Sequence, residues 1–384
     1  MCRRIAIVLL FLTAACLPTR QLESASTATP SVPPAATETS DRPYVYLTPT
    51  PGYPAEGFGP YDFPVDINPL TGLSTDPQWL DRRPLIIKVS NLPRNVRPQF
   101  GLSRADVIYE YYTEEGTTRF AAIYYSQEAE KVGSIRSARF FDEHLIRMYN
   151  GIFVFGSADE RTLDRLYSAG FANRLIVEWE AGCPAMCRPD PVTDFLIADT
   201  AAVRKYVRKQ RISDDRQNLE GMRFQLQVPD GGQGARQAVV WYSAVIYNRW
   251  KYDPASGVYS RYSDVVDALD GKPEEYEQLT DALTGEPITA ENVAVILMQH
   301  DFFSISPEVL EMQFQGSGPA YAFRDGRAYE LEWVRPGKNE VVYLVAKDGE
   351  RYAFKPGVTW FEVMGISSEL QKSGEVWRFE MRFP

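Results

Sequence analysis

The chain has 384 residues, 44% of them hydrophobic, so it is long enough to bury substantial cores in two domains. Its formal net charge of −10 argues against broad binding to nucleic acid, because phosphate backbones require basic surfaces. The 27 prolines, 26 glycines and 13% aromatic content favour strands and turns over a helical bundle.

The N-terminus has the pattern of an export signal. Arg3 and Arg4 precede an apolar run at 5–12 that is too short for a permanent membrane span. Small residues then lead to Cys16, and Leu-Thr-Ala-Ala-Cys resembles the lipobox at which bacterial lipoproteins are cleaved and lipidated. We therefore expect residues 1–16 to be a lipoprotein signal peptide. Acyl chains on Cys16, palmitate among them, would anchor the exported protein to the outer face of the cytoplasmic membrane. The alternative is a secretory peptide cleaved near Ala15, with Cys16 incidental.

Residues 17–57 are rich in Ser, Thr and Pro and contain few large apolar side chains. Such a segment cannot bury enough surface to offset the entropy lost on ordering. Its prolines favour an extended chain, so we expect a tether that holds the folded part away from the membrane.

The folded sequence is predicted to begin near Phe58 with an α/β domain over 58–212 that contains a mixed sheet. Short apolar runs predict buried strands at 85–89, 107–112, 119–125 and 151–156. Helical spacing of apolar residues predicts helices at 140–150, 160–170 and 193–208.

The composition changes near 210–222, and the remainder is predicted to be a β-rich, mostly antiparallel domain over 222–384. Strands are expected at 224–228, 238–241, 244–252, 258–262, 293–298, 321–323, 327–333, 340–346 and 351–354. The fold class is therefore α+β. Aromatic residues concentrated in this half either form core and cross-strand pairs or stack on sugars and partner proteins: Trp241, Tyr242, Tyr247, Trp250, Tyr252, Tyr259 and Tyr262.

Cys183 and Cys187 are close in sequence, and in an exported protein such a pair predicts a small disulfide loop. A redox-active pair is the lesser alternative, because three residues separate the cysteines where thioredoxin-type sites have two. No second cysteine pair completes a zinc site, and neither His144 nor His300 adjoins a nucleophile motif. We therefore expect no metal and no cofactor.

The candidate binding residues are Arg97, Arg119, Arg136 and Arg139, which flank two of the predicted strands. Arginine forks bind carboxylate and phosphate in a bidentate way, so these side chains could hold an anionic polymer, a glycan or a lipid-linked pyrophosphate. The nearby carboxylates could act as a base, which makes Asp106 and Glu110 the catalytic candidates. Alternatively, the arginines pair with Asp106, Glu110 and Glu114 and only stabilise the strand ends.

The chain resembles the YerB-like lipoproteins, a family with two domains of unknown function 3048. The resemblance covers roughly 65–365. The N-terminal half contains the segments Asn68-Pro-Leu-Thr-Gly72, Arg97-Pro-Gln-Phe-Gly-Leu-Ser-Arg-Ala-Asp-Val-Ile-Tyr-Glu110, Gly116-Thr-Thr-Arg-Phe120 and Gly133-Ser-Ile-Arg-Ser-Ala-Arg139. The C-terminal half adds Tyr252-Asp-Pro-Ala-Ser-Gly257, 281–285, Gly316-Ser-Gly318 and Lys355-Pro-Gly-Val-Thr-Trp360.

The resemblance implies a bacterial, membrane-anchored envelope protein with an α/β and a β-rich domain, but it implies no reaction. Family members often have Asn-His after the first strand, whereas this chain has Ser90-Asn91-Leu92, which excludes a catalytic histidine there. We therefore expect a non-catalytic binding or regulatory module for a cell-wall polymer or an envelope protein. The alternative is an envelope glycan or phosphotransfer enzyme that uses the arginine–carboxylate set.

Overall fold

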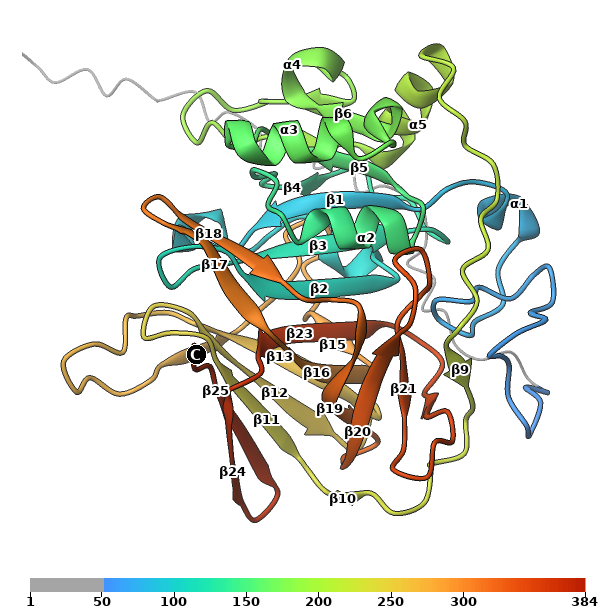
Figure 1. Cartoon of the computed structure of the whole chain (residues 1–384), viewed down its shortest axis with the longest axis vertical. Coiled ribbons are helices and arrows are strands. Elements are labelled where there is room, and N and C mark those ends of the chain that lie inside the picture. The colour runs from blue at the N-terminus through green and yellow to red at the C-terminus, as the bar shows by residue number, and fades with distance from the viewer. Residues whose placement is uncertain (1–51, 384) are drawn as a thin grey trace, which may run out of the picture. The chain divides into compact units, whose positions relative to one another are not determined.

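The fold is α+β, as the sequence predicts, and strands predominate in it. The computed structural model describes residues 52–383 (Figure 1), so the predicted signal peptide, Cys16 and most of the tether lie outside the described residues. In the part that is described, no helix combines the length and the apolar character needed to cross a membrane. The helices are α1 (Pro77–Leu80), α2 (Asp142–Met148), α3 (Glu160–Ser168), α4 (Glu178–Ala181) and α5 (Thr200–Lys209), with 3-10 turns η1 (Arg94–Val96), η2 (Leu102–Arg104) and η3 (Ala172–Arg174).

One large mixed sheet runs through the molecule (Figure 1), in the order β10-β20-β19-β16-β23-β2-β3-β1-β5-β6, with β21 paired to β20. The N-terminal half contributes β1 (Leu85–Ser90), β2 (Val107–Tyr112), β3 (Thr118–Tyr124), β5 (Ile152–Phe155) and β6 (Leu175–Val177). The C-terminal half contributes β10 (Gln233–Gly234), β16 (Asn292–Met298), β19 (Gly316–Arg324), β20 (Arg327–Arg335), β21 (Tyr343–Val345) and β23 (Thr359–Gly365).

The strand β23 connects the two halves, because it pairs in parallel with both β2 and β16. No strand was predicted from the sequence at this place. All seven residues of β23 are buried, but Glu362 interrupts their apolar run and hides the strand signal. The two predicted domains therefore share one continuous sheet.

A second sheet, in the order β14-β13-β12-β11-β25-β24 with β15 paired to β13, belongs to the C-terminal half. The aromatic residues predicted there are mainly core: Tyr242, Tyr247, Trp250 and Tyr259 are buried, while Trp241, Tyr252 and Tyr262 are half-buried. The strands are β11 (Gln237–Trp241), β12 (Tyr247–Asp253), β13 (Val258–Asp264), β14 (Tyr276–Gln278), β15 (Thr289–Ala290), β24 (Glu369–Ser373) and β25 (Val376–Glu380).

The remaining strands form three small sheets, none of which was predicted in full. The first is a hairpin of β17 (His300–Ile305) and β18 (Glu308–Met312), which was not predicted. In the second sheet, β24 and β25 were not predicted either. The pair β9 (Arg223–Phe224) and β22 (Ala353–Phe354) is parallel. The third small sheet contains β4 (Val132–Gly133), β7 (Met186–Cys187) and β8 (Ile197–Ala198).

The predicted helix at 193–208 was wrong in its first half. Ile197 and Ala198 pair with β4 and β7 as strand β8, and α5 begins only after Asp199. The side chain of Asp199 accepts a hydrogen bond from the backbone N–H of Ala202, which caps the helix at that point.

Alternation along β2 separates the two faces of the large sheet. Tyr109 and Tyr111 contact the residues that flank the two ends of α2: the Tyr149 hydroxyl and the ring of Phe141, respectively. Glu110 points to the other face and pairs with Arg261 of the second sheet. Because side chains alternate along a strand, neighbours in sequence are placed in different environments.

Candidate functional site

The candidate site lies where the parallel strands β1 and β5 end. The segment 134–138 crosses both carboxyl ends: the backbone N–H of Arg136 donates to the Lys88 carbonyl at 3.0 Å, and Gly156 N–H donates to the Arg136 carbonyl at 3.0 Å. The N–H of Ala138 donates to the Ser157 carbonyl at 2.8 Å. This is the edge of an α/β sheet at which ligands usually bind.

Three of the four predicted arginines, Arg119, Arg136 and Arg139, lie at this edge, and two of them share one carboxylate. Arg119, on β3, donates to Glu114 Oε1 at 2.7 Å and to the Ser137 carbonyl at 2.7 Å. Arg139 donates through Nε to Glu114 Oε2 at 2.6 Å, and through Nη2 to Oε1. We call Glu114, Arg119, Arg136 and Arg139 the carboxyl-edge cluster.

The pKa values in the carboxyl-edge cluster reflect this crowding. Burial lowers the pKa of Arg119 to about 10, and the charges of Arg139 and Arg136 act in the same direction. Burial alone would raise the pKa of Glu114, but hydrogen bonds and charge from Arg139 and Arg119 outweigh it, so the pKa is lowered. Glu114 is therefore an ionised partner of two guanidinium groups.

Arg136 differs from its two neighbours because its side chain is exposed. Its Nε donates to the Ser90 hydroxyl at 3.2 Å, and no carboxylate among residues 52–383 lies within ion-pairing distance of it. The carboxyl-edge cluster thus contains three guanidinium groups and one carboxylate. Its excess positive charge faces solvent at Arg136.

A fully buried ion pair lies beneath the carboxyl-edge cluster. Lys88 Nζ lies 3.2 Å from Asp142 Oδ1 and 3.8 Å from the centroid of the Tyr111 ring. Asp142 also accepts hydrogen bonds from the Tyr111 hydroxyl and from the Arg139 N–H, the latter at 2.7 Å. Burial lowers the pKa of Lys88 to about 7 and raises that of Asp142. This pair was not predicted from the sequence, although a lysine inside an apolar strand is a signal for it.

The predicted catalytic candidates lie elsewhere. Asp106 is buried and accepts hydrogen bonds from Asn68 Nδ2 at 2.7 Å, from the Tyr125 and Ser126 N–H groups and from the Ser126 hydroxyl. Glu110 is also buried, and its Oε2 lies 2.5 Å from Arg261 Nη2. Burial raises the pKa of Glu110 to about 8 against the opposing charge of Arg261. Neither carboxylate contacts an arginine of the carboxyl-edge cluster.

Glu110 belongs to a buried triad between the two sheets. Arg261 pairs with Glu110 and, at 3.0 Å, with Glu362 of β23. Trp250 Nε1 donates to Glu362 Oε1 at 2.8 Å, and Asn248 Nδ2 bridges both carboxylates at 3.3 Å. The carboxylate oxygens of Glu110 are therefore engaged by partners inside the core.

Arg97, the fourth predicted arginine, is separate from the carboxyl-edge cluster. Its guanidinium donates to the Asn91 carbonyl at 3.0 Å and to Asp264 Oδ1 at 3.0 Å, and only 9% of its side chain is exposed. Asp264 also pairs with Arg94 at 2.7 Å. Arg97 therefore connects the loop after β1 to the end of β13.

His300 is buried and His144 is half-buried, and both rings contact backbone carbonyls. His144 Nε2 lies 3.0 Å from the Met312 carbonyl oxygen, and His300 Nδ1 lies 2.9 Å from that of Met298. Burial lowers both pKa values to about 4, so both rings are neutral at pH 7. Within residues 52–383 there is no group of three or more His, Cys, Asp or Glu side chains arranged to hold a metal ion.

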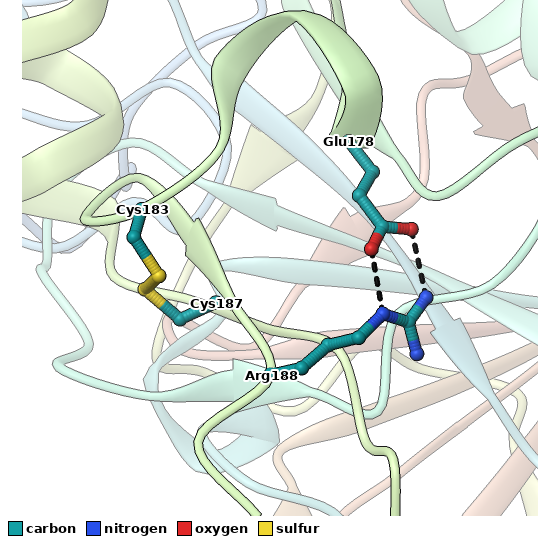
Figure 2. Close-up of a disulfide and its surroundings, with 4 residues drawn as sticks. All are labelled: Glu178, Cys183, Cys187 and Arg188. Carbon is teal, nitrogen blue, oxygen red and sulfur yellow. Dashed lines mark hydrogen bonds and ion pairs between the residues drawn. A yellow bond between two sulfur atoms is a disulfide. The ribbon is translucent and has the colours of Figure 1, made fainter. Parts of the chain in front are cut away.

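Figure 2 shows the two cysteines of the described chain joined in a short loop between α4 and β7. The Sγ atoms of Cys183 and Cys187 lie 2.12 Å apart. Beside the loop, Arg188 donates to both carboxylate oxygens of Glu178, at 2.6 and 2.7 Å (Figure 2). The Arg188 side chain thereby ties the end of the loop to α4.

Comparison with known families gives two matches that are consecutive along the chain. The N-terminal domain of the family described as Protein of unknown function (DUF3048) matches residues 70–211. The C-terminal domain of the same family matches residues 238–361. The carboxyl-edge cluster lies within the first match.

One relative and one solved structure match most of the chain. YerB of Bacillus subtilis (strain 168), whose name marks it as a candidate lipoprotein, is 28% identical over 312 residues, covering 77% of this chain and 85% of YerB. The crystal structure of the Bacillus subtilis YerB protein matches with a TM-score of 0.65 and 26% identity, covering 78% of this chain and 96% of that one.

Proposed function

Since the chain belongs to the DUF3048 family of YerB-like proteins, we propose that it is an exported, lipid-anchored protein that binds an anionic cell-envelope polymer at the carboxyl-edge cluster. The proposal assigns it a binding or regulatory role without catalysis. Its N-terminal signal, its lipobox-like cysteine and the name of its relative support the location.

The observation that carries the binding site is the charge imbalance at the carboxyl-edge cluster. Glu114 is shared by Arg119 and Arg139, which leaves the exposed guanidinium of Arg136 available for an external anion. A guanidinium presents several N–H donors in a fixed plane and therefore suits phosphate or carboxylate groups. A polymer that repeats such groups would also gain from the neighbouring positive charges.

The contacts of Asp106 and Glu110 support a role without catalysis. Both carboxylates are buried and hydrogen-bonded inside the fold. A general base must reach the proton that it abstracts, within hydrogen-bonding distance or through one water. In this arrangement the carboxylates stabilise the fold, and the arginines at the surface supply the binding.

The anchor is tested by fractionation of cells that express the full chain. The wild-type protein should fractionate with the membrane and incorporate labelled palmitate, because acyl chains on Cys16 would hold it there. Cys16→Ser should lose both properties, while Cys183→Ser serves as a control that removes a different cysteine. Membrane retention and labelling of Cys16→Ser would contradict the assignment of the anchor.

The binding site is tested with the full chain in detergent and a panel of envelope fragments: peptidoglycan, polyglycerol phosphate and lipid pyrophosphates. Arg136→Ala/Arg139→Ala should weaken polymer binding by about tenfold or more, which corresponds to about 1.4 kcal/mol. Binding should also weaken as salt rises, since the contacts are between exposed charges. The control is Arg208→Ala, which removes an exposed arginine on α5.

The folded state of each variant is checked by thermal unfolding before binding is compared. Equal binding by the folded double variant would remove the site from the carboxyl-edge cluster. Failure of the wild-type chain to bind any fragment would contradict the polymer as ligand and leave an envelope protein as the partner to seek.

A further inference from the structure

A cavity of about 350 Å³ lies at the opposite edge of the sheet, where the parallel strands begin. Arg174 directly precedes β6, Asn150 lies just before β5, and Arg147 is in the last turn of α2. The segment after α5 and the loop after β20 complete the wall. We call this cavity the amino-edge pocket; its polar lining residues are Arg147, Asn150, Arg174, Gln217, Asn218 and Asn339.

The lining of the amino-edge pocket contains two guanidinium groups and no carboxylate, on a chain whose net charge is −10. Both guanidinium groups lie over the ring of Phe171, with centroid distances of 5.2 Å for Arg147 and 5.6 Å for Arg174. The two like charges beside this buried ring repel each other, and an anion bound between them would offset that repulsion.

Arg174 has no counter-charge in the described chain. Its Nη1 donates to the Gly151 carbonyl at 3.1 Å, and no carboxylate among residues 52–383 lies within ion-pairing distance. The pKa of Arg174 is lowered to about 10, mainly by burial and to a lesser extent by the charges of Arg83 and Arg147. A half-buried guanidinium without a partner pays a desolvation cost that a bound anion would offset.

Arg147 is only partly paired. Its Nε donates to Glu143 Oε1 at 2.7 Å and its Nη2 to the Ala169 carbonyl at 3.0 Å. Glu143 is shared, since Arg165 Nε also donates to it at 2.5 Å. The Nη1 group of Arg147 donates to no group of residues 52–383 and is a second donor for an external anion.

Amide side chains supply the neutral part of the lining. Asn218 Oδ1 accepts from the Glu220 N–H at 3.0 Å, and the Asn218 Nδ2 donates to no described group. The Asn339 side chain makes no hydrogen bond with the described residues and is exposed. Free amide groups of this kind pair readily with hydroxyl groups, because each offers both donors and an acceptor.

A neighbouring cavity of about 420 Å³ shares Asn218 and Asn339 with the amino-edge pocket. Its lining includes Tyr343, over whose ring Arg351 lies at 3.4 Å, and the carboxylates of Glu220 and Glu340. Carboxylate oxygens accept hydrogen bonds from hydroxyl groups. Together the two cavities have a cationic end at Arg147 and Arg174. They continue into a region whose amide and carboxylate groups can bind hydroxyl groups.

We propose that the amino-edge pocket binds a small, hydroxyl-rich anion of the sugar-phosphate or sugar-acid class, with its oxyanion between Arg147 and Arg174. The hydroxyl-bearing remainder extends past Asn218 and Asn339 into the neighbouring cavity. Both volumes are in the range of sites for small molecules. This site is separate from the carboxyl-edge cluster, since the residues of the two sites do not overlap.

The test is calorimetric titration of the full chain with four probes: glucose 6-phosphate, glucuronate, inorganic phosphate and glucose. We expect saturable binding of glucose 6-phosphate or glucuronate, and the preferred one identifies the oxyanion as phosphate or carboxylate. Inorganic phosphate should bind more weakly than the preferred sugar, because it lacks the hydroxyl contacts. Glucose should not bind measurably, because it lacks the charge.

Variants then locate the binding. Arg174→Gln removes the unpaired charge and should raise Kd by about tenfold or more. Asn339→Asp adds a negative charge at an exposed position that makes no hydrogen bond in the described chain, and it should raise Kd several-fold without affecting folding. The controls are Arg208→Gln, an exposed arginine on α5, and Arg136→Gln at the carboxyl-edge cluster; neither should change the Kd.

Several results would overturn the proposal. The first is that neither sugar anion binds at concentrations up to about 10 mM. The second is that Asn339→Asp and a folded Arg174→Gln both bind the sugar anion with unchanged affinity. The third is that glucose binds as tightly as the sugar anions. Loss of sugar-anion binding in Arg136→Gln alone would move the site to the carboxyl-edge cluster. If the wild-type chain binds the sugar anion but no envelope polymer, only the proposed function is contradicted.

Discussion

The arginines at the two edges of the large sheet differ in their charge partners. At the carboxyl edge, Arg119 and Arg139 share Glu114, and Lys88 pairs with Asp142 beneath them. Within the carboxyl-edge cluster only Arg136, which is exposed, has no carboxylate partner among residues 52–383. At the amino edge, Arg174 has no carboxylate partner among residues 52–383. A cluster of arginines in a sequence is therefore weak evidence for a binding site, because an internal carboxylate can already occupy them. An unpaired guanidinium beside a cavity is the more informative observation.

The largest expected effect is on the stability of the carboxyl edge. Lys88→Met leaves Asp142 buried without its cation, and breaking a buried pair in this way typically costs about 3–5 kcal/mol. Urea unfolding of the full chain measures this loss. The control Lys205→Met alters an exposed lysine on α5 and should leave the midpoint unchanged. A Lys88→Met protein as stable as the wild type would show that the pair contributes nothing net.

The same pair predicts a pH dependence. The pKa of Lys88 is lowered from 10.5 to about 7 by burial, so between these values the unfolded chain binds a proton that the folded chain does not. Stability contributed by this group therefore rises with pH in that window, by at most about 1.4 kcal/mol per pH unit. Urea unfolding at pH 7, 8 and 9 measures it.

The pH dependence of the wild type has to be compared with that of Lys88→Met, because other groups also titrate. The pKa of Glu110 is raised to about 8, so below that pH Glu110 makes the free energy of unfolding fall as pH rises. The stability of the wild type relative to Lys88→Met should increase from pH 7 to pH 9. A constant difference across this range would indicate that Lys88 stays charged in the folded protein.

Glu114→Gln would make the carboxyl edge resemble the amino edge. The change removes the counter-charge of Arg119 and Arg139 and should cost about 1–3 kcal/mol, as expected for lost charge-assisted hydrogen bonds. At the same time it should strengthen binding of an anionic polymer, because two more guanidinium groups become available. Thermal unfolding and polymer titration measure the two effects. Weaker binding in a folded Glu114→Gln protein would contradict the proposed site.

The smallest expected effect is a difference in stability between one variant at the carboxyl edge and one at the amino edge. Arg119→Gln breaks an ion pair with Glu114, whereas Arg174→Gln removes a charge that has no carboxylate partner in the described chain. We expect Arg174→Gln to change the free energy of unfolding by less than about 1 kcal/mol, and by less than Arg119→Gln does. The two variants are compared in one urea series. The reverse order would indicate that Arg174 is mainly structural.

Much of the local structure could be predicted from the sequence. The apolar runs at 85–89, 107–112 and 119–125 correspond to β1, β2 and β3, since a strand buried on both faces needs continuous apolar side chains. The strand β23 was missed because its buried Glu362 resembles an exposed residue until Arg261 is placed beside it. The amino-edge pocket was missed because its lining comes from four separate segments of the chain.

The sequence by itself determined the α+β class, the order β1-β2-β3-α2-β5-α3 within the N-terminal half, and the family to which the chain belongs. It also brought Arg119, Arg136 and Arg139 forward as candidates. Only the tertiary structure decided which acids they meet. Asp106 lies before β2 and binds the turn at Asn68, and Glu110 points to the face opposite the arginines, because side chains alternate along a strand. Charge partners depend on strand register and face, and these are properties of the folded sheet.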